Sequence, residues 1–317
     1  MLPFLAAISA RQGGLVLAHQ AVAVGMTREE IRRLVHTGTW TRIRRSAYVE
    51  TALWAAADPN ARHRLLARAT ILLGDCSAVV CDRSAVAWHN LDTLTPPPSA
   101  VHLRVPTASG GRSSRLVTRH LGELPPHLRQ DYGGVAVVVP TVAAVEMARN
   151  APFGEAVVVC DSVLRTGTTS QQMKDALPAV AFCTGAAAAA RAVGFADGRS
   201  GSAGESLSRV VLHELGLDPE DLQTAIRDDR GLVGITDFSW LSHRTVGEFD
   251  GRVKYGRDGP TDASRDVLWR EKQREDRLRA GGLEMVRWTW GDLGHPEQIA
   301  RRILAAWDRA AQRIHAA

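Results

Sequence analysis

The segments 232–240 and 245–250 predict two β-strands that are separated by only four residues, 241–244. So short a connection joins neighbouring antiparallel strands, and the two segments are therefore expected to form a hairpin. Successive side chains of a strand point to opposite faces, so Glu248 and Asp250 share a face. In this hairpin Asp237 lies directly opposite Glu248, with the two Cβ atoms ~5 Å apart.

Three carboxylates on one face of a hairpin repel one another, above all the opposed pair Asp237 and Glu248. A bound divalent cation relieves such repulsion, and carboxylate oxygens suit Mg²⁺ or Mn²⁺. The alternative is an acidic face that is open to water or paired with nearby arginines. Val246 and Phe249 indicate a central strand, and Gly251 ends it directly after the acids. The pattern therefore predicts a metal site at this strand end.

Residues 201–317 form the domain expected around this hairpin. Helices are predicted at 202–215, 264–280 and 296–314, and strands at 222–227, 232–240, 245–250 and 284–290. The expected fold of this part is an α/β domain.

The ordered motifs of this domain resemble the PD-(D/E)XK nuclease superfamily, and within it the very-short-patch-repair (Vsr)-like branch of endonuclease-related domains. The motifs are Ile235-Thr236-Asp237 on one strand, Glu248-Phe249-Asp250-Gly251 on the next, Glu271-Lys272-Gln273-Arg274-Glu275-Asp276 on a helix, and Val286-Arg287-Trp288-Thr289-Trp290 on the last strand. The resemblance covers residues 202–293. It implies a nuclease-like domain with a mixed sheet flanked by helices, and an endonuclease activity that hydrolyses DNA phosphodiester bonds with a divalent metal.

The resemblance also implies the metal ligands. Asp237 and Glu248 are expected to hold Mg²⁺ or Mn²⁺, and Glu205 on the preceding helix is a third candidate. Glu205 has an alternative role, because Ser202-Ala203-Gly204-Glu205 is an S-x-x-E capping box that needs no metal. The ion would lower the pKa of a bound water and polarise the scissile phosphate.

One catalytic residue of the superfamily is missing from its usual place. The lysine expected two residues after the second acid is replaced by Asp250. Lys272 on the following helix, or Lys254 in the loop 251–262, is expected to offset the charge of the phosphate instead. If neither lysine reaches the acids, the domain is expected to be catalytically inert and the protein to act as a regulator.

Residues 1–50 predict three short helices followed by a strand pair, which is the order of a winged helix-turn-helix. The third helix begins at Thr27, and Glu30 completes a T-x-x-E capping box. Its buried side is formed by Ile31, Leu34 and Val35. The helices are expected at 2–10, 18–24 and 27–37, and the strand pair at 40–49.

The outer side of this third helix is basic. Arg28, Arg32 and His36 recur every four residues and share a face, as a helix that reads the major groove requires. The adjacent Arg33 and the hairpin arginines Arg42, Arg44 and Arg45 are expected to contact phosphates of double-stranded DNA. The alternative is an ordinary solvated helix in a chain with 39 basic residues, of which only Lys174, Lys254 and Lys272 are lysines.

The same segment resembles the N-terminal winged helix of AbiEi-family antitoxins. The matching residues are Gly25-Met26-Thr27, Ile31-Arg32-Arg33-Leu34 and the run from Gly38 to Val49 with the pattern G-x-W-x-R-I-x-x-x-x-Y. The resemblance implies a DNA-binding autoregulator that pairs with a nucleotidyltransferase-type toxin in a toxin–antitoxin system.

Three domains are therefore expected: a winged helix at 1–55, a small α/β region at 56–200, and the nuclease-like domain at 201–317. The net charge of +5 is compatible with a polyanionic partner. No apolar run approaches the ~18 residues of a membrane helix, so no membrane partner is expected. The four cysteines show no C-x-x-C pair, which favours a reduced, cytoplasmic protein without structural zinc.

Overall fold

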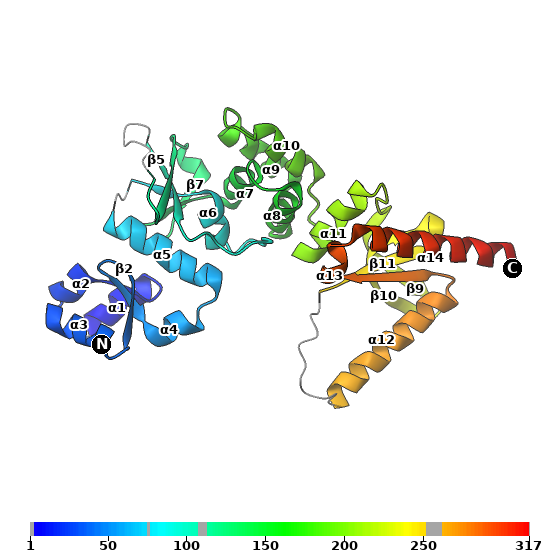
Figure 1. Cartoon of the computed structure of the whole chain (residues 1–317), viewed down its shortest axis with the longest axis horizontal. Coiled ribbons are helices and arrows are strands. Elements are labelled where there is room, and N and C mark those ends of the chain that lie inside the picture. Colours follow the sequence, from blue (N-terminus) through cyan, green and yellow to red (C-terminus); the bar gives the residue numbers. More distant parts are fainter. Residues whose placement is uncertain (1–2, 75–76, 107–112, 252–261, 317) are drawn as a thin grey trace. The chain divides into compact units, whose positions relative to one another are not determined.

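The computed structural model describes residues 3–74, 77–106, 113–251 and 262–316. The chain divides into two units (Figure 1). The first contains residues 1–152 and 168–194, and the second contains residues 153–167 and 195–317. Each unit combines helices with a mixed β-sheet, as the α/β fold class predicts.

The first unit begins with the three helices and the hairpin expected from the sequence, together with one short strand that was not expected. In order, these elements are α1 (Pro3–Arg11), β1 (Leu15–Leu17), α2 (Ala18–Ala23), α3 (Arg28–His36), β2 (Trp40–Arg44) and β3 (Ala47–Glu50). The three strands form an antiparallel sheet in the order β1-β3-β2. This order of helices and strands is that of a winged helix.

Local sequence signals explain the placement of α3. The Thr27 hydroxyl accepts the Glu30 N–H at 3.1 Å, and the Glu30 carboxylate accepts the Thr27 N–H at 2.7 Å. The predicted capping box therefore forms and sets the first residue of the helix. Ile31 is buried against Leu5 and Trp40, so the opposite side of α3 faces solvent.

The rest of the first unit is built around a five-stranded sheet with the order β6-β5-β4-β8-β7. Its strands are β4 (Val79–Val80), β5 (Val101–Val105), β6 (Val117–Leu121), β7 (Arg129–Asp131) and β8 (Ala136–Val138). The accompanying helices are α4 (Thr51–Ala56), α5 (Pro59–Leu73), α6 (Asp82–Trp88), α7 (Pro140–Ala148), α9 (Ser170–Ala176) and α10 (Ala186–Phe195). Pairs β5–β6 and β4–β8 are parallel and the others antiparallel.

The second unit is built around a four-stranded sheet with the order β12-β11-β10-β9, in which only β11 and β12 run parallel. The strands are β9 (Asp221–Asp228), β10 (Gly231–Trp240), β11 (Thr245–Asp250) and β12 (Glu284–Thr289). The helices are α8 (Phe153–Arg165), α11 (Ala203–Glu214), α12 (Asp262–Ala280), α13 (Trp290–Leu293) and α14 (Pro296–Ala316). The element order expected for residues 201–317 is therefore observed, with the short α13 added.

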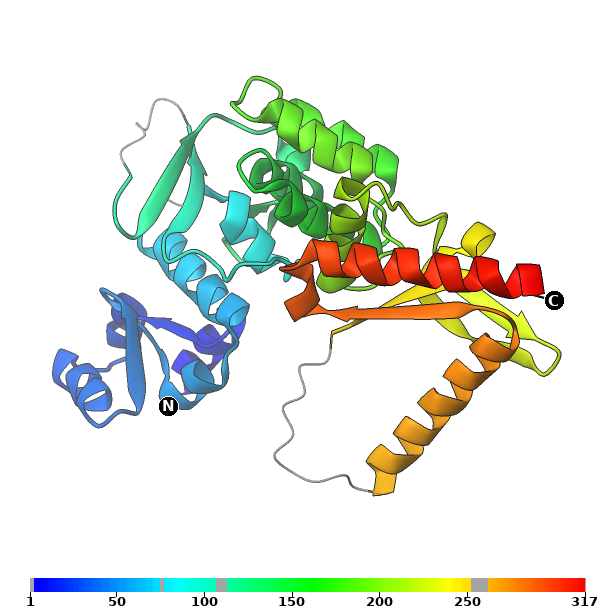
Figure 2. The same cartoon turned by 45° about the vertical axis from the view of Figure 1, so that its right-hand side comes forward.

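The core of the second unit lies between the sheet and two helices. Phe238, Trp240 and Trp288 pack with Leu212 of α11 and Ile303 of α14. Helix α12 contacts β10 and β12, and both views show it on the other side of the sheet from α14 (Figures 1 and 2). The sheet is thus flanked by helices. The acidic residues lie within β10, at Asp237, and at the C-terminal end of β11, at Glu248 and Asp250.

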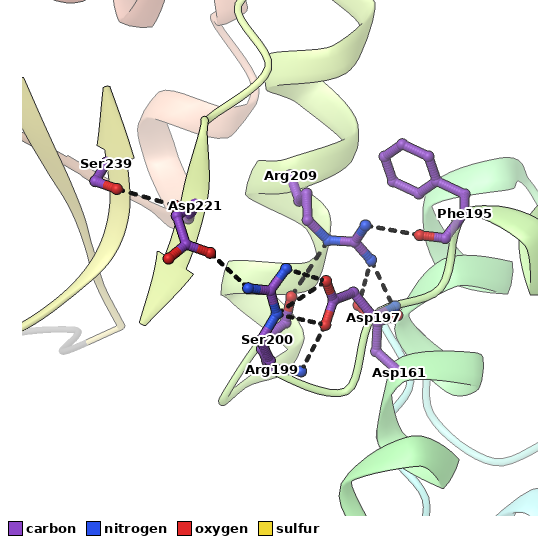
Figure 3. A network of polar contacts seen from close by, with 8 residues as sticks. All are labelled: Asp161, Phe195, Asp197, Arg199, Ser200, Arg209, Asp221 and Ser239. Atoms are coloured by element: carbon purple, nitrogen blue, oxygen red, sulfur yellow. Dashed lines mark hydrogen bonds and ion pairs between the residues drawn. The ribbon is translucent and has the colours of Figure 1, made fainter. Parts of the chain in front are cut away.

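Helix α8 lies in the range expected for the middle region but packs in the second unit, against α11. A buried ion pair joins the two helices: Arg209 Nη2 lies 2.9 Å from Asp161 Oδ2, and Asp161 is fully buried (Figure 3). Arg209 also donates to the Phe195 carbonyl at 2.7 Å, and the Asp197 N–H donates to Asp161 at 2.8 Å. These bonds satisfy both charges, as burial requires.

Candidate functional site

Asp237 and Glu248 lie in one row across the four-stranded sheet of the second unit. Phe238 pairs with Gly247 on one side and with Leu222 on the other. One step along, this register places Asp237 between Glu248 on β11 and Gln223 on β9. Glu248 in turn pairs with Arg287 of the parallel strand β12. The row therefore contains the opposed carboxylates that the hairpin predicts.

Asp237 is held by hydrogen bonds from two neighbours. The Phe249 N–H donates to its Oδ2 at 2.8 Å, and the Gln223 amide donates to its Oδ1 at 3.3 Å. Burial raises the pKa of Asp237 to about 6, and the charges of Glu205 and Glu248 act in the same direction, against the two hydrogen bonds. Asp237 is therefore a carboxylate whose charge the fold opposes.

Glu205 is linked to Asp237 through a single amide. The Gln223 Nε2 that faces Asp237 also donates to Glu205 Oε2 at 2.9 Å. Glu205 accepts the Gly201 N–H at 2.7 Å, and the Ser202 hydroxyl caps α11 by accepting the Glu205 N–H at 3.2 Å. The side chain thus bonds to the start of the helix, which is the capping role that the sequence offered, and it also faces Asp237 through Gln223. Its role as a metal ligand stays a prediction.

Glu248 is neutralised by arginines. Arg274 of α12 forms an ion pair with one carboxylate oxygen, and Arg287 Nε lies 3.2 Å from the other. Arg274 also donates to the Ile235 carbonyl at 2.8 Å, which fixes it over the strand end. For Glu248, the structure therefore shows the pairing with arginine that the sequence offered as the alternative to a metal.

These side chains surround a hollow of about 330 Å³ at the C-terminal end of β11, which we call the acidic hollow. Three carboxylates and two guanidinium groups line it, so its charges nearly balance. The lining residues are Ile235, Asp237, Glu248, Phe249, Asp250, Gly251, Arg274 and Arg287.

Of the two lysines expected at this site, Lys272 is not among the residues that line the hollow. Lys272 is exposed on α12, and Lys254 lies outside the described residues. The positive charge comes instead from Arg274, two residues beyond Lys272 on the same helix, and from Arg287. The basic character of the helix was a usable signal for Arg274. Arg287 could be found only from the parallel pairing of β11 with β12.

A second candidate site lies on the winged-helix part of the first unit. Arg28, Arg32, Arg33 and His36 are all exposed on α3, as their spacing predicts. Arg28 and Arg32 line one hollow of about 770 Å³ together with Arg45 of the hairpin turn. The expected reading helix and wing therefore converge on a single concave basic surface.

The hairpin arginines differ in exposure. Arg42 and Arg45 are exposed, whereas Arg44 is half-buried and its Nη2 donates to the Leu116 carbonyl at 3.4 Å. Burial also lowers the pKa of Arg44. On α3, Arg32 lies 2.6 Å from Glu29, but both side chains are more than two-thirds exposed, so the pair is weak and a phosphate can replace it.

Residues 3–51 match the family described as transcriptional regulator, AbiEi antitoxin. The matched segment runs from α1 to β3, which is the part that carries the basic surface. The resemblance inferred from residues 25–49 is therefore confirmed for the N-terminal domain. The match ends at residue 51 and does not test the nuclease resemblance of residues 202–293.

Two relatives from Mycobacterium tuberculosis match most of the chain. They are the uncharacterized protein Rv2248 of strain H37Rv and the uncharacterized protein MT2308 of strain CDC 1551. Each is 29% identical over 287 residues, which cover 90% of this chain and 98% of the relative. Both units of the present chain therefore occur together in these relatives.

A crystal structure of the RV2827C protein from Mycobacterium tuberculosis also aligns, at 12% identity over 70% of this chain and 83% of that chain, with a TM-score of 0.37. In the described part of the chain, no helix is both long enough and apolar enough to cross a membrane.

Proposed function

We propose that this protein is a DNA-binding transcriptional regulator of the AbiEi antitoxin type. In this proposal α3 enters the major groove and the hairpin β2–β3 contacts the flanking phosphates as a wing. The observation that supports it best is the convergence of Arg28, Arg32 and Arg45 on one concave surface, within the segment that matches the family.

The physical argument rests on which side of α3 is buried. Ile31 holds the helix against the domain, so the arginines four residues apart project away from it. Guanidinium groups bind phosphates and guanine edges, and each phosphate contact releases counterions. Because Arg44 is tied to Leu116, the contribution of the wing is assigned to Arg42 and Arg45.

The family description implies a toxin partner as well as an operator. A nucleotidyltransferase-type toxin remains the partner that we propose, on the basis of the family match over residues 3–51.

The test is a DNA-binding series on the full chain. Replacing Arg42 and Arg45 by Ala should weaken binding to all duplexes and lower the salt slope by about 1 for each arginine that no longer neutralises a phosphate. Arg32→Ala should cost about 1–3 kcal/mol on the preferred site and relax sequence preference. Arg301→Ala, at an exposed position of α14, is the matched control. Equal binding by all four proteins would remove α3 and the wing from the interface.

A second function, metal-dependent cleavage of DNA, is favoured by the acidic hollow. The donor set of Asp237, Glu248 and Glu205 fits Mg²⁺ or Mn²⁺ in chemistry, since all three offer carboxylate oxygens. The raised pKa of Asp237 reflects burial and repulsion, which a cation would relieve. When bound, the ion would polarise the scissile phosphate and lower the pKa of a bound water.

The arginines of the hollow have a role in this second function. Arg274 and Arg287 neutralise Glu248, and a cation on Glu248 would release the Arg274 guanidinium from this ion pair, so that it could bind a phosphate. Arg274 Nε is already buried without a hydrogen-bond partner. We therefore propose Arg274, rather than Lys272 or Lys254, as the residue that offsets the charge of the phosphate.

Cleavage of supercoiled DNA with Mg²⁺ or Mn²⁺ tests this function. Asp237→Asn and Glu248→Gln should abolish cleavage while DNA binding by the first unit persists. Arg274→Ala should slow cleavage more than Lys272→Ala. A wild-type protein that binds DNA but neither cleaves it nor gains thermal stability with Mg²⁺ or Mn²⁺ would exclude the cleavage function and keep only the regulator function.

A further inference from the structure

A cluster of two histidines and one aspartate lies in the first unit and shares no residue with either site described above. Asp82 is the first residue of α6, His102 is on β5, and His120 is on β6. The Nδ1 of His102 lies 3.1 Å from the Nε2 of His120. Asp82 Oδ2 lies 3.6 Å from the former and 3.7 Å from the latter. Three donor atoms from three elements thus lie within 3.7 Å of one another.

The size of this triangle matches a bound metal ion. In the plane of the three atoms, the point that is equidistant from them lies about 2.0 Å from each. This distance is the length of a Zn–N or Zn–O bond. Two imidazoles and one carboxylate form the ligand set of many catalytic zinc and non-haem iron sites. Without an ion, only one of the two facing ring nitrogens can carry a proton in this contact.

The surroundings hold the three donors in place. Asp82 has a φ of +50°, a left-handed conformation that is uncommon for non-glycine residues, and this backbone sets the direction of its side chain. Its N–H donates to Glu146 Oε2 at 2.8 Å, and its Oδ1 accepts the Arg83 N–H at 2.7 Å. These bonds leave Oδ2 directed at the rings.

The histidine on β5 is supported in the same way. The backbone N–H of His102 donates to Ser84 Oγ at 2.8 Å, and this hydroxyl lies 2.7 Å from His63 Nε2. Ser84 belongs to the same helix as Asp82, so the helix start and the strand are joined beside the cluster. Outer bonds of this kind fix ligand orientation at metal sites.

We propose that Asp82, His102 and His120 bind a divalent transition metal, with Zn²⁺ as the first candidate, and leave one coordination position open to solvent. Nitrogen donors favour Zn²⁺ over Mg²⁺. The side chains of His102 and His120 are 17% and 20% exposed, while Asp82 is 8% exposed. An ion can therefore reach the site, and its fourth ligand can be water.

This site would tie the start of α6 to two strands of the five-stranded sheet. The expectation that the chain holds no structural zinc rested on cysteine spacing alone, and none of these ligands is a cysteine. The proposal is independent of the DNA-binding and cleavage functions, because no ligand belongs to the basic surface or to the acidic hollow.

Metal titration of the tag-free, chelator-stripped full chain tests the proposal. Zn²⁺ should bind at one ion per chain in calorimetry, and Co²⁺ should give the visible absorption bands of a low-coordinate site with nitrogen ligands. His120→Ala should weaken Zn²⁺ binding by about 100-fold or more. His127→Ala, at an exposed position of the same unit, is the control and should bind as the wild type does.

Asp82→Asn keeps the side-chain shape and guards against a variant that fails to fold. It should give the far-ultraviolet circular dichroism spectrum of the metal-free wild type, yet lose the rise in melting temperature that Zn²⁺ gives the wild type. Asp237→Asn should keep that rise, which separates this cluster from the acidic hollow. Zn²⁺ binding that is absent from the wild type, or unchanged in His120→Ala and Asp82→Asn, would overturn the proposal.

Discussion

Replacing Asp237 by Asn should stabilise the protein, and the gain should grow with pH. The fold raises the pKa of Asp237 to about 6 from an ordinary 3.8. The folded chain therefore holds this proton more tightly than the unfolded chain does. Consequently the stability of the wild type decreases as the pH rises from about 4 to about 6, and then stays level.

The size of the effect follows from the pKa difference. A shift of this size corresponds to about 3 kcal/mol, at 1.36 kcal/mol per pKa unit. Asp237 lies beside an open hollow, so solvent screening reduces the expected gain to about 1–2 kcal/mol above pH 7. At about pH 5, where the wild-type carboxyl is mostly protonated, the gain should be about half as large.

Urea denaturation of the full chain at pH 5 and pH 8 measures this difference. Asp308→Asn, on the exposed side of α14, serves as the control and should show no such dependence. Added Mg²⁺ or Mn²⁺ should stabilise the wild type, because an ion that binds only the folded state raises its stability. It should not stabilise Asp237→Asn, because this variant lacks one of the proposed carboxylate ligands. A variant that is less stable than the wild type at pH 8 would refute the argument that repulsion and burial oppose this charge.

Three further substitutions test the packing that positions the sites. Thr27→Ala removes the cap of α3 and should lower the free energy of unfolding by about 1 kcal/mol, with weaker DNA binding; unchanged melting would contradict the role of the cap. Arg209→Met leaves Asp161 buried and charged, so stability should fall by about 3–5 kcal/mol, and adding Asp161→Asn should recover part of it. Gly204→Ala places a Cβ where the ring of Phe249 already lies and should cost about 1–3 kcal/mol, measured by urea denaturation.

The features that the sequence predicts well are local ones. The capping box at Thr27 involves residues three apart, and the hairpin of β10 and β11 involves a four-residue connection. In both cases few alternatives compete, so the register of Asp237 against Glu248 follows from the loop length alone. The exposed stripe on α3 follows from helical periodicity in the same way.

The features that the sequence does not predict depend on distant pairing. Gln223 meets Asp237 because β9 lies beside β10, and Arg287 meets Glu248 because β12 returns parallel to β11 after α12. Neither the strand order nor the direction of the fourth strand is encoded in a short motif. The sequence predicted Lys272 at the site, but Arg274 occupies it. The two residues are only two positions apart, which on a helix places them on different faces.

The histidine cluster was also not predicted from the sequence, because its three residues lie on three separate elements. His102 and His120 are on neighbouring strands, and Asp82 reaches them only through its left-handed backbone at the start of α6. No fixed spacing of these residue types marks a metal site, unlike the cysteine pairs of a zinc finger. The packing of helix α8 in the second unit was not predicted for a similar reason, since its partner α11 lies beyond two intervening α-helices.

The salt dependence of binding tests whether the first unit binds duplex DNA through α3 and the wing, as we propose. Fluorescence anisotropy of the full chain on a duplex from its own promoter region, repeated over a range of KCl concentrations, gives the slope of log K against log salt. About four arginine–phosphate contacts predict a slope of about −3.6, at −0.9 for each phosphate neutralised. Arg42→Ala with Arg45→Ala should reduce that slope by about 2. Binding that is absent, or that does not weaken as salt increases, would show that these arginines do not bind DNA phosphates.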